Sequence, residues 1–393
     1  MAVRPMLRFP ATRVPGGFHR RAVTVGVTLL AASGFATLGS AGTVSGTAGA
    51  AAPPFLSRFT SVTTVASTVP ANGDVNPYGI VSVPMSTGNL VAGDTLVSNF
   101  NARSNLQGTG TTIVEISPSG TQTVFAHLHR SQLPGPCPGG LGLTTALTVL
   151  GNGYVVVGSL PVPDAGMGTP GAGCLIVINP DGQPVETWTS NQINGPWDLA
   201  LVQSGSTDEL FVTNVLNKTV AAAGQPVNAG TVVRLDVSVP NGKPPTVFSS
   251  TTVAQGFTEQ LNSSALVLGP TGDAVNHAGT LYVADTINNR IAVIPDATTR
   301  TTPMRGGGYT LSYGGSLNAP LGMALAPNGD ILTVNGGDGN AVETTPLGKQ
   351  VDTVEIDPLN AGGDLFGLIV APNNNGVLFV DDGDNTLKLF GPA

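Results

Sequence analysis

One unit recurs along this chain and limits its fold more than any other feature. A short apolar strand is followed by a turn rich in Gly or Asn and by a second apolar strand that ends in Asp, Asn or Ser. The clearest copy joins residues 281–285 to residues 290–294 through an Asn-rich turn. Short apolar runs between such turns indicate β-strands. No stretch has a sustained 3.6-residue apolar period, which excludes helical repeats.

Six copies of the unit can be recognised, at intervals of roughly 40 to 70 residues, as in propellers and solenoids. Their first strands are expected at residues 77–80, 146–149, 196–200, 264–268, 320–325 and 365–370. One such unit cannot bury both of its faces, but units packed face to face around an axis can. We therefore predict an all-β fold, a six-bladed β-propeller.

The ends of the units predict how the ring closes. Several units finish with a fourth, polar-alternating strand, at residues 121–125, 185–188, 246–248 and 351–355. The last unit stops at Phe390 without one, and residues 59–65 near the start of the mature chain supply a matching segment. We predict that this N-terminal strand closes the last blade, which removes an open sheet edge.

The first 52 residues have the pattern of an export signal. Basic residues precede a modest apolar run at residues 22–38, small residues follow it, and no acidic residue occurs before Asp74. The pair Arg20-Arg21 favours the twin-arginine route, with the general secretory route as the alternative. A membrane anchor is the weaker interpretation because Gly and Thr interrupt the run. We expect a signal and cleavage region at 1–52, a single propeller domain at 53–393, and a secreted or periplasmic location.

The net charge limits the kinds of partner, and the two cysteines indicate a disulfide. Removal of the five arginines at positions 4 to 21 would change the net charge from −8 to −13, which disfavours nucleic acid and anionic membrane as partners. We expect a monomer whose partner is a protein, a glycan or a small molecule.

Cys137 and Cys174 are the only cysteines. In an exported protein they are expected to form a disulfide, with two separate buried thiols as the alternative.

A family resemblance agrees with this architecture. Residues 281–294, with Tyr282-Val283-Ala284-Asp285 and Asn289-Arg290-Ile291 at their centre, resemble the consensus of NHL repeats. The resemblance implies an NHL- or lactonase-like propeller of the secreted bacterial type, and it extends unevenly over the mature chain. Propellers of this group include binding scaffolds as well as lactonase-like and lyase-like enzymes, so the function does not follow from the fold.

Loop lengths indicate one functional face. The connections between second and third strands are long in the first three units, at about residues 98–111, 159–174 and 214–231, and short in the last three. Long loops on a rigid scaffold commonly form binding sites, although they can also simply tolerate sequence drift.

Trp197 and Asp198 open the inner strand of the third blade, and Tyr78 and Phe366 occupy comparable positions. They are candidate ligand-binding residues; packing between blades is the alternative.

Three residues are candidates for catalysis or metal binding. His127 and His129 stand two apart, so an extended chain would direct both imidazoles to one side. Glu259, expected in the loop that leads into the fourth blade, is a possible third group. Polar surface residues are the alternative interpretation. No cofactor is predicted, although a divalent metal such as calcium is possible. Asp381 begins an acidic run at 381–385 that lacks the closing Glu of an EF-hand.

The sequence therefore leads to two functional hypotheses. The preferred one is an exported propeller that acts as a binding or interaction scaffold through its loop-rich face. The alternative is a metal-dependent, lactonase-like hydrolase at the mouth of the channel, with His127, His129, Asp198 and Glu259 as candidate groups. Convergence of these four side chains on one point would favour the hydrolase, because metal ligands must surround a single ion.

Overall fold

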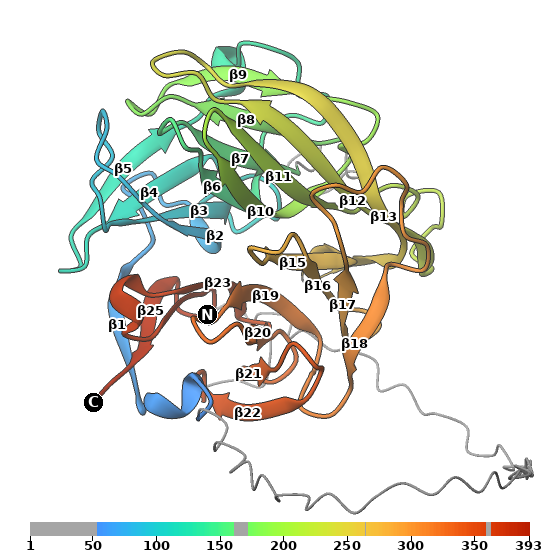
Figure 1. Ribbon diagram of the computed structural model, residues 1–393. Coiled ribbons are helices and arrows are strands. Elements are labelled where there is room, and N and C mark those ends of the chain that lie inside the picture. The colour runs from blue at the N-terminus through green and yellow to red at the C-terminus, as the bar shows by residue number, and fades with distance from the viewer. Residues whose placement is uncertain (1–52, 161–171, 264, 359–362) are drawn as a thin grey trace, which may run out of the picture. The chain divides into compact units, whose positions relative to one another are not determined.

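The structure of this protein is a computed structural model that describes residues 53–160, 172–263, 265–358 and 363–393. These residues form six antiparallel sheets arranged as the blades of a propeller (Figure 1). The predicted six-bladed β-propeller is confirmed. The predicted signal at 1–52 lies outside the described residues. Within the described part of the chain, no helix has the length and apolarity needed to span a membrane.

Blades one to five are built from consecutive strands, and in all six blades the first strand of the repeat unit is innermost. Blade one contains β2 (Val75–Ser82), β3 (Thr95–Asn101), β4 (Thr112–Ile116) and β5 (Gln122–His127). Blade two contains β6 (Leu143–Val149), β7 (Val155–Ser159), β8 (Cys174–Ile178) and β9 (Pro184–Trp188). Blade three contains β10 (Pro196–Ser204), β11 (Thr207–Asn214), β12 (Val227–Ser238), β13 (Thr246–Asn262) and β14 (Leu266–Leu268).

The second half of the ring follows the same order. Blade four contains β15 (Pro270–Val275), β16 (Leu281–Asp285), β17 (Arg290–Ile294) and β18 (Tyr309–Tyr313). Blade five contains β19 (Pro320–Leu325), β20 (Ile331–Asn335), β21 (Asn340–Thr344) and β22 (Gln350–Glu355). Blade six contains β23 (Leu365–Val370), β24 (Val377–Asp381), β25 (Thr386–Gly391) and β1 (Ser61–Ser67). Three short 3₁₀ helices are η1 (Leu56–Arg58), η2 (Arg130–Gln132) and η3 (Pro372–Asn374).

Burial explains why the middle strands read as continuous apolar runs. Every residue of β7 and of β8 is buried, because both faces of these strands pack against neighbouring blades. The outermost strands β9 and β22 are only half-buried or exposed, and their sequences are accordingly more polar. The core is therefore a series of apolar layers between blades.

The ring closes as predicted, by pairing the two ends of the propeller domain. β1 lies antiparallel to β25, with Ser61 opposite Gly391 and Val62 opposite Phe390. A second contact was not foreseen from the sequence. The backbone N–H groups of Phe55 and Leu56 donate to the buried carboxylate of Glu343 in blade five, at 2.7 and 2.8 Å. The N-terminal segment therefore joins blades five and six.

One predicted strand was assigned to the wrong place. Residues 264–268 were expected to be the inner strand of blade four, but Leu266–Leu268 forms β14, which pairs with the end of β13. The inner strand is β15, in which Pro270 lies opposite Asp285. Glu259, expected in the loop before blade four, lies in β13. An apolar run predicts a strand, but it does not distinguish an inner strand from an extra outer one.

The predicted disulfide is confirmed. Cys137 and Cys174 are bonded, with their Cα atoms 5.3 Å apart. The bond ties the connection between blades one and two to the start of β8, at the end of the molecule where the long loops lie.

Candidate functional site

One end of the propeller carries both kinds of connection that could form a site. Pro77 at the start of an inner strand lies opposite Asn99 near the end of the second strand, and Pro196 lies opposite Asn214 in the same way. The loops that lead into the inner strands therefore share a face with the loops after the second strands. We call this the loop face. Its second-to-third connections are long in blades one to three (102–111, 160–173, 215–226) and short in blades four to six (286–289, 336–339, 382–385).

Four aromatic side chains meet where the inner strands begin on the loop face. We call Tyr78, Phe100, Trp197 and Phe366 the mouth cluster. The ring of Tyr78 stacks on Phe100 and on Phe366, with centroids 4.4 and 3.8 Å apart. The ring of Trp197 lies 6.4 Å from that of Tyr78 and 6.3 Å from that of Phe366. Tyr78, Trp197 and Phe366 come from blades one, three and six, and each directly follows an inner-strand residue that pairs with the second strand.

Most of the surface of the mouth cluster is used in packing. All four side chains are at most 2% exposed, so the stacked faces do not form an open platform. The indole N–H of Trp197 donates to the carbonyl of Val267 at 3.3 Å. Of the two interpretations of these residues, packing between blades is what the geometry shows directly. Ligand contact is restricted to the cavity beside the cluster.

The cavity beside the mouth cluster is small and amphipathic. Its volume is about 10 Å³, and it is lined by Tyr78, Phe100, Thr144, Thr145, Leu160, Trp197 and Ala265. None of these lining residues is charged. The hydroxyls of Tyr78, Thr144 and Thr145 are buried and have no hydrogen-bond partner among the described atoms. Burial raises the pKa of Tyr78 well above its ordinary value, and the negative charge of Asp382 raises it further. The phenol therefore stays neutral and can donate a hydrogen bond.

Two carboxyl groups on the inner strands of blades three and four interact electrostatically. Asp198 is half-buried in β10, and Asp273 is 5% exposed in β15. The backbone N–H of Leu199 donates to Asp198 at 2.9 Å. Burial raises the pKa of both groups well above the ordinary range, and for Asp273 the charge of Asp198 adds to this effect. A hydrogen bond from the backbone of Ala200 opposes the rise in the pKa of Asp273.

The two candidate catalytic histidines differ from the buried pair Asp198 and Asp273 in burial and in contacts. His127 and His129 are exposed, with ring centroids 4.4 Å apart, so the spacing does bring the two imidazoles together. The side-chain amide nitrogen of Asn72 lies 3.4 Å from Nε2 of His127. Among the described residues, neither histidine belongs to a cluster of three or more metal-ligating groups.

Glu259 is fully buried and holds a loop. Its carboxylate accepts hydrogen bonds from the backbone N–H of Lys218 at 2.8 Å and from that of Asn217 at 3.4 Å. Burial raises its pKa, and these hydrogen bonds oppose the rise. Glu259 thus anchors the long connection of blade three. Among the described residues, His127, His129, Asp198 and Glu259 do not form a metal-binding cluster.

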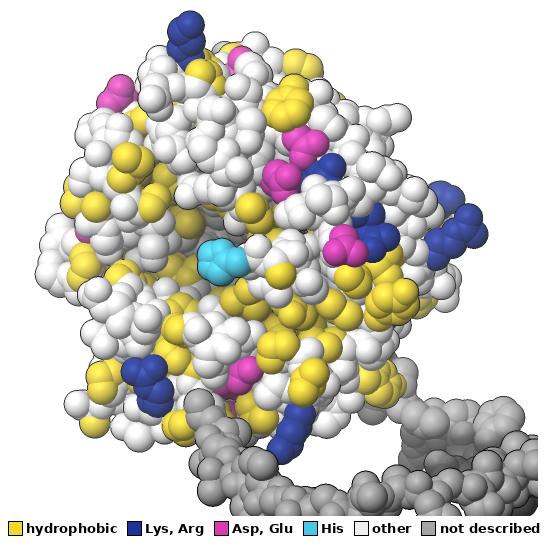
Figure 2. All heavy atoms as spheres, viewed as in Figure 1, with side chains coloured by type: hydrophobic (Ala, Val, Ile, Leu, Met, Phe, Trp, Pro, Cys, Tyr) yellow, Lys and Arg dark blue, Asp and Glu magenta, His cyan; other side chains and the backbone are white. Residues whose placement is uncertain are grey.

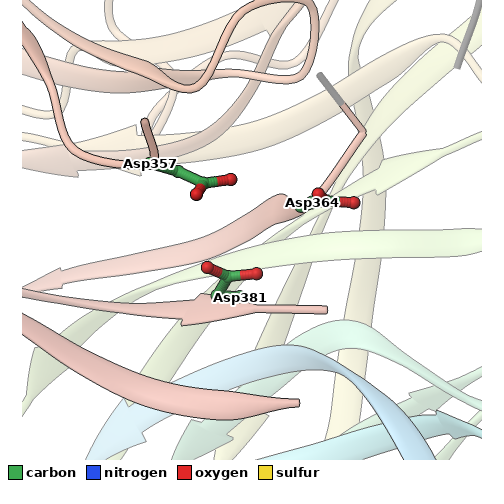
Figure 3. A group of neighbouring side chains, drawn as sticks. All are labelled: Asp357, Asp364 and Asp381. Carbon is green, nitrogen blue, oxygen red and sulfur yellow. The ribbon is translucent and has the colours of Figure 1, made fainter. Parts of the chain in front are cut away.

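A different carboxylate group was not predicted as a site. Asp357, Asp364 and Asp381 lie on the loop face, with ligand atoms all within 4.8 Å of one another, and their carboxylates face a shared space (Figure 3). Carboxylate oxygens suit a hard cation such as calcium. The ammonium of Lys388 contacts Asp381 at 2.5 Å and offsets part of the charge. Burial raises the pKa of Asp381, and the hydrogen bond from Lys388 opposes this.

The equivalent position in blade four has a structural role. Asp285 ends β16 as Asp381 ends β24, and it forms a buried ion pair with Arg290 at 2.7 Å. The sequence shows that an Asp or Asn recurs at this position in several blades. It gave no signal for Asp357 or Asp364, because these residues lie between strands and outside the repeat.

The surface shown in Figure 2 is weakly charged. Lysine, arginine and acidic side chains lie scattered among uncharged ones, and no large patch of one sign is seen on this side.

Comparison with known proteins shows the fold. No protein-family model matches the chain, and no curated protein matches it. Similar solved structures include a virginiamycin B lyase from Staphylococcus aureus, 12% identical with a TM-score of 0.51, in an alignment that covers 85% of this chain and 99% of the lyase. A gluconolactonase from Xanthomonas campestris is 13% identical with a TM-score of 0.52, over 86% of this chain and 94% of the other. At this identity the likeness supports the propeller fold alone.

Proposed function

We propose that this protein is an exported binding protein that takes up a small uncharged molecule at the loop face, beside the mouth cluster. The observation that carries the proposal is the uncharged cavity, in which aromatic walls stand beside three buried hydroxyls that have no hydrogen-bond partner among the described residues. Binding sites for small molecules combine apolar and aromatic walls with a few polar groups in this way. The disulfide is consistent with export, because such bonds persist in oxidising compartments.

Tryptophan fluorescence provides a direct test. The chain has two tryptophans, Trp188 in the half-buried outer strand β9 and Trp197 at the cavity. In a Trp188→Phe variant, emission reports on Trp197 alone. We expect uncharged ring compounds from a small-molecule library to change this emission and to raise the melting temperature. A ligand at a hundred times its Kd should stabilise the fold by about 2.7 kcal/mol. If no member of the library alters emission or melting, the proposal is wrong.

A metal-dependent hydrolase of lactonase type is the second candidate function. It is favoured by the three carboxylates of Asp357, Asp364 and Asp381 and by the names of the two similar structures, a lyase and a lactonase. The oxygen donors would fit calcium, and Lys388 would compete with the ion for Asp381.

Metal analysis separates the two functions. The hydrolase requires stoichiometric calcium, manganese or zinc in the purified protein, lost on Asp364→Asn, with lactone hydrolysis lost in parallel. Asp296→Asn, at an exposed turn residue, is the matched control and should leave both unchanged. Purified protein without bound metal, and without a change in melting on addition of these ions, would exclude this function.

A further inference from the structure

We propose that the cavity beside the mouth cluster is an anchor for one uncharged polar group, an alcohol or a carbonyl, carried on a ring-shaped ligand. This inference rests on the proposed function and specifies the chemistry that the site would recognise.

The hydroxyls that line the cavity have no hydrogen-bond partner in the described part of the chain. Tyr78, Thr144 and Thr145 are 2%, 3% and 3% exposed, and their hydroxyl oxygens have no hydrogen-bond partner among the described atoms. Buried hydroxyls are nearly always hydrogen-bonded, since leaving one unpaired is unfavourable. All three residues line the same cavity. A single guest there could serve more than one of them.

The size of the cavity limits that guest to one polar group. Its volume of about 10 Å³ corresponds to room for a single water. A hydroxyl or a carbonyl oxygen has the size of a water and could replace it while reproducing its hydrogen bonds. The remainder of a ligand must then lie at the opening of the cavity, because Trp197 and Tyr78 are only 2% exposed.

The charge of the cavity selects an uncharged group. No lining residue carries a charge, and the Tyr78 phenol stays neutral. An ionised carboxylate would lose its hydration without gaining a counter-charge from the lining, and the negative charge of Asp382 near Tyr78 would oppose it further. Hydroxyl side chains can both donate and accept, which suits an alcohol or a carbonyl. The aromatic walls favour a ring next to this group.

Three matched probes test the anchor in the Trp188→Phe protein. Phenol carries a ring and a hydroxyl, benzene carries the ring alone, and benzoate carries the ring with a charge. Titrations followed by Trp197 emission should show phenol binding at least about tenfold more tightly than benzene, with benzoate weakest. Thr144→Val and Thr145→Val keep the side-chain shape and remove one hydroxyl each.

The variants locate the effect. At least one of Thr144→Val and Thr145→Val should weaken phenol binding by about tenfold and leave benzene binding unchanged. Thr333→Val is the control, because the Thr333 hydroxyl is also buried and unpaired but does not line the cavity. Circular dichroism and melting curves identify any variant that fails to fold, and the other threonine variant then decides the test.

The outcomes distinguish this inference from the proposed function. Equal binding of phenol and benzene, or threonine variants that behave like Thr333→Val, would overturn the anchor and leave small-molecule binding intact. The same holds if Trp197 emission responds to other uncharged compounds but to none of the three probes. A protein whose Trp197 emission responds to no uncharged compound would overturn both.

Discussion

At the residue scale, the sequence showed which aromatic residues begin inner strands, but it did not show which side chains contact one another. Tyr78, Trp197 and Phe366 were singled out because they open inner strands, and the structure brings them together. That their faces stack on one another could not be predicted, since stacking depends on the distances between blades. Thr144 and Thr145 gave no signal, because a threonine in an apolar strand reads as an ordinary β-branched residue.

The pair Asp198 and Asp273 leads to a prediction of pH dependence at the same scale. Both pKa values are raised above the unfolded value of about 3.9, so the folded state binds more protons than the unfolded state above that pH. The contribution of these two carboxyl groups to the free energy of unfolding is therefore fully present at low pH. It is lost as the pH rises from the unfolded pKa through the folded pKa values. One such group changes stability by about 1.4 kcal/mol per pH unit over this range.

Asp273→Asn removes one titrating carboxyl and its charge. We expect this variant to be at least as stable as the native protein at pH 8 and to lose less stability between pH 5 and pH 8. Denaturant unfolding at several pH values measures both effects. Asp296→Asn, at an exposed turn, should retain the native pH dependence. An Asp273→Asn protein with the native slope would show that Asp273 is not the titrating group.

At the element scale, the repeat predicted most strands because each one has a buried apolar run. The closing strand β1 was predicted for a physical reason as well, since the last unit lacked a partner for its open edge. The inner strand of blade four was missed because β15 begins Pro270-Thr271-Gly272-Asp273, which is less apolar than the neighbouring β14. Hydropathy alone favoured the wrong segment.

A prediction at this scale concerns the long connection at 215–226, which Glu259 holds in place. In Glu259→Ala the N–H groups of Asn217 and Lys218 lose their acceptor, and we expect a loss of about 1–3 kcal/mol in stability. Hydrogen exchange should accelerate in this loop more than elsewhere. Glu355→Ala, at an exposed residue of β22, is the control. Unchanged exchange in the loop would mean that Glu259 does not anchor it.

At the scale of the whole molecule, the fold was readable from the sequence and the function was not. A propeller follows from repetition and closure, which are visible in one chain. A site depends on residues that different blades bring to one end, such as Tyr78, Thr145 and Trp197, or Asp357 and Asp381. These residues share no spacing in the sequence. The loop face was nevertheless predicted correctly, because loop length is a property of each blade alone.

The most direct test of the central claim is the emission of Trp197 in the Trp188→Phe protein during titration with uncharged ring compounds. Binding beside the mouth cluster predicts a saturable change in emission, accompanied by a rise in melting temperature. Emission that stays constant for every uncharged compound, in a protein that is folded by circular dichroism, would contradict the claim.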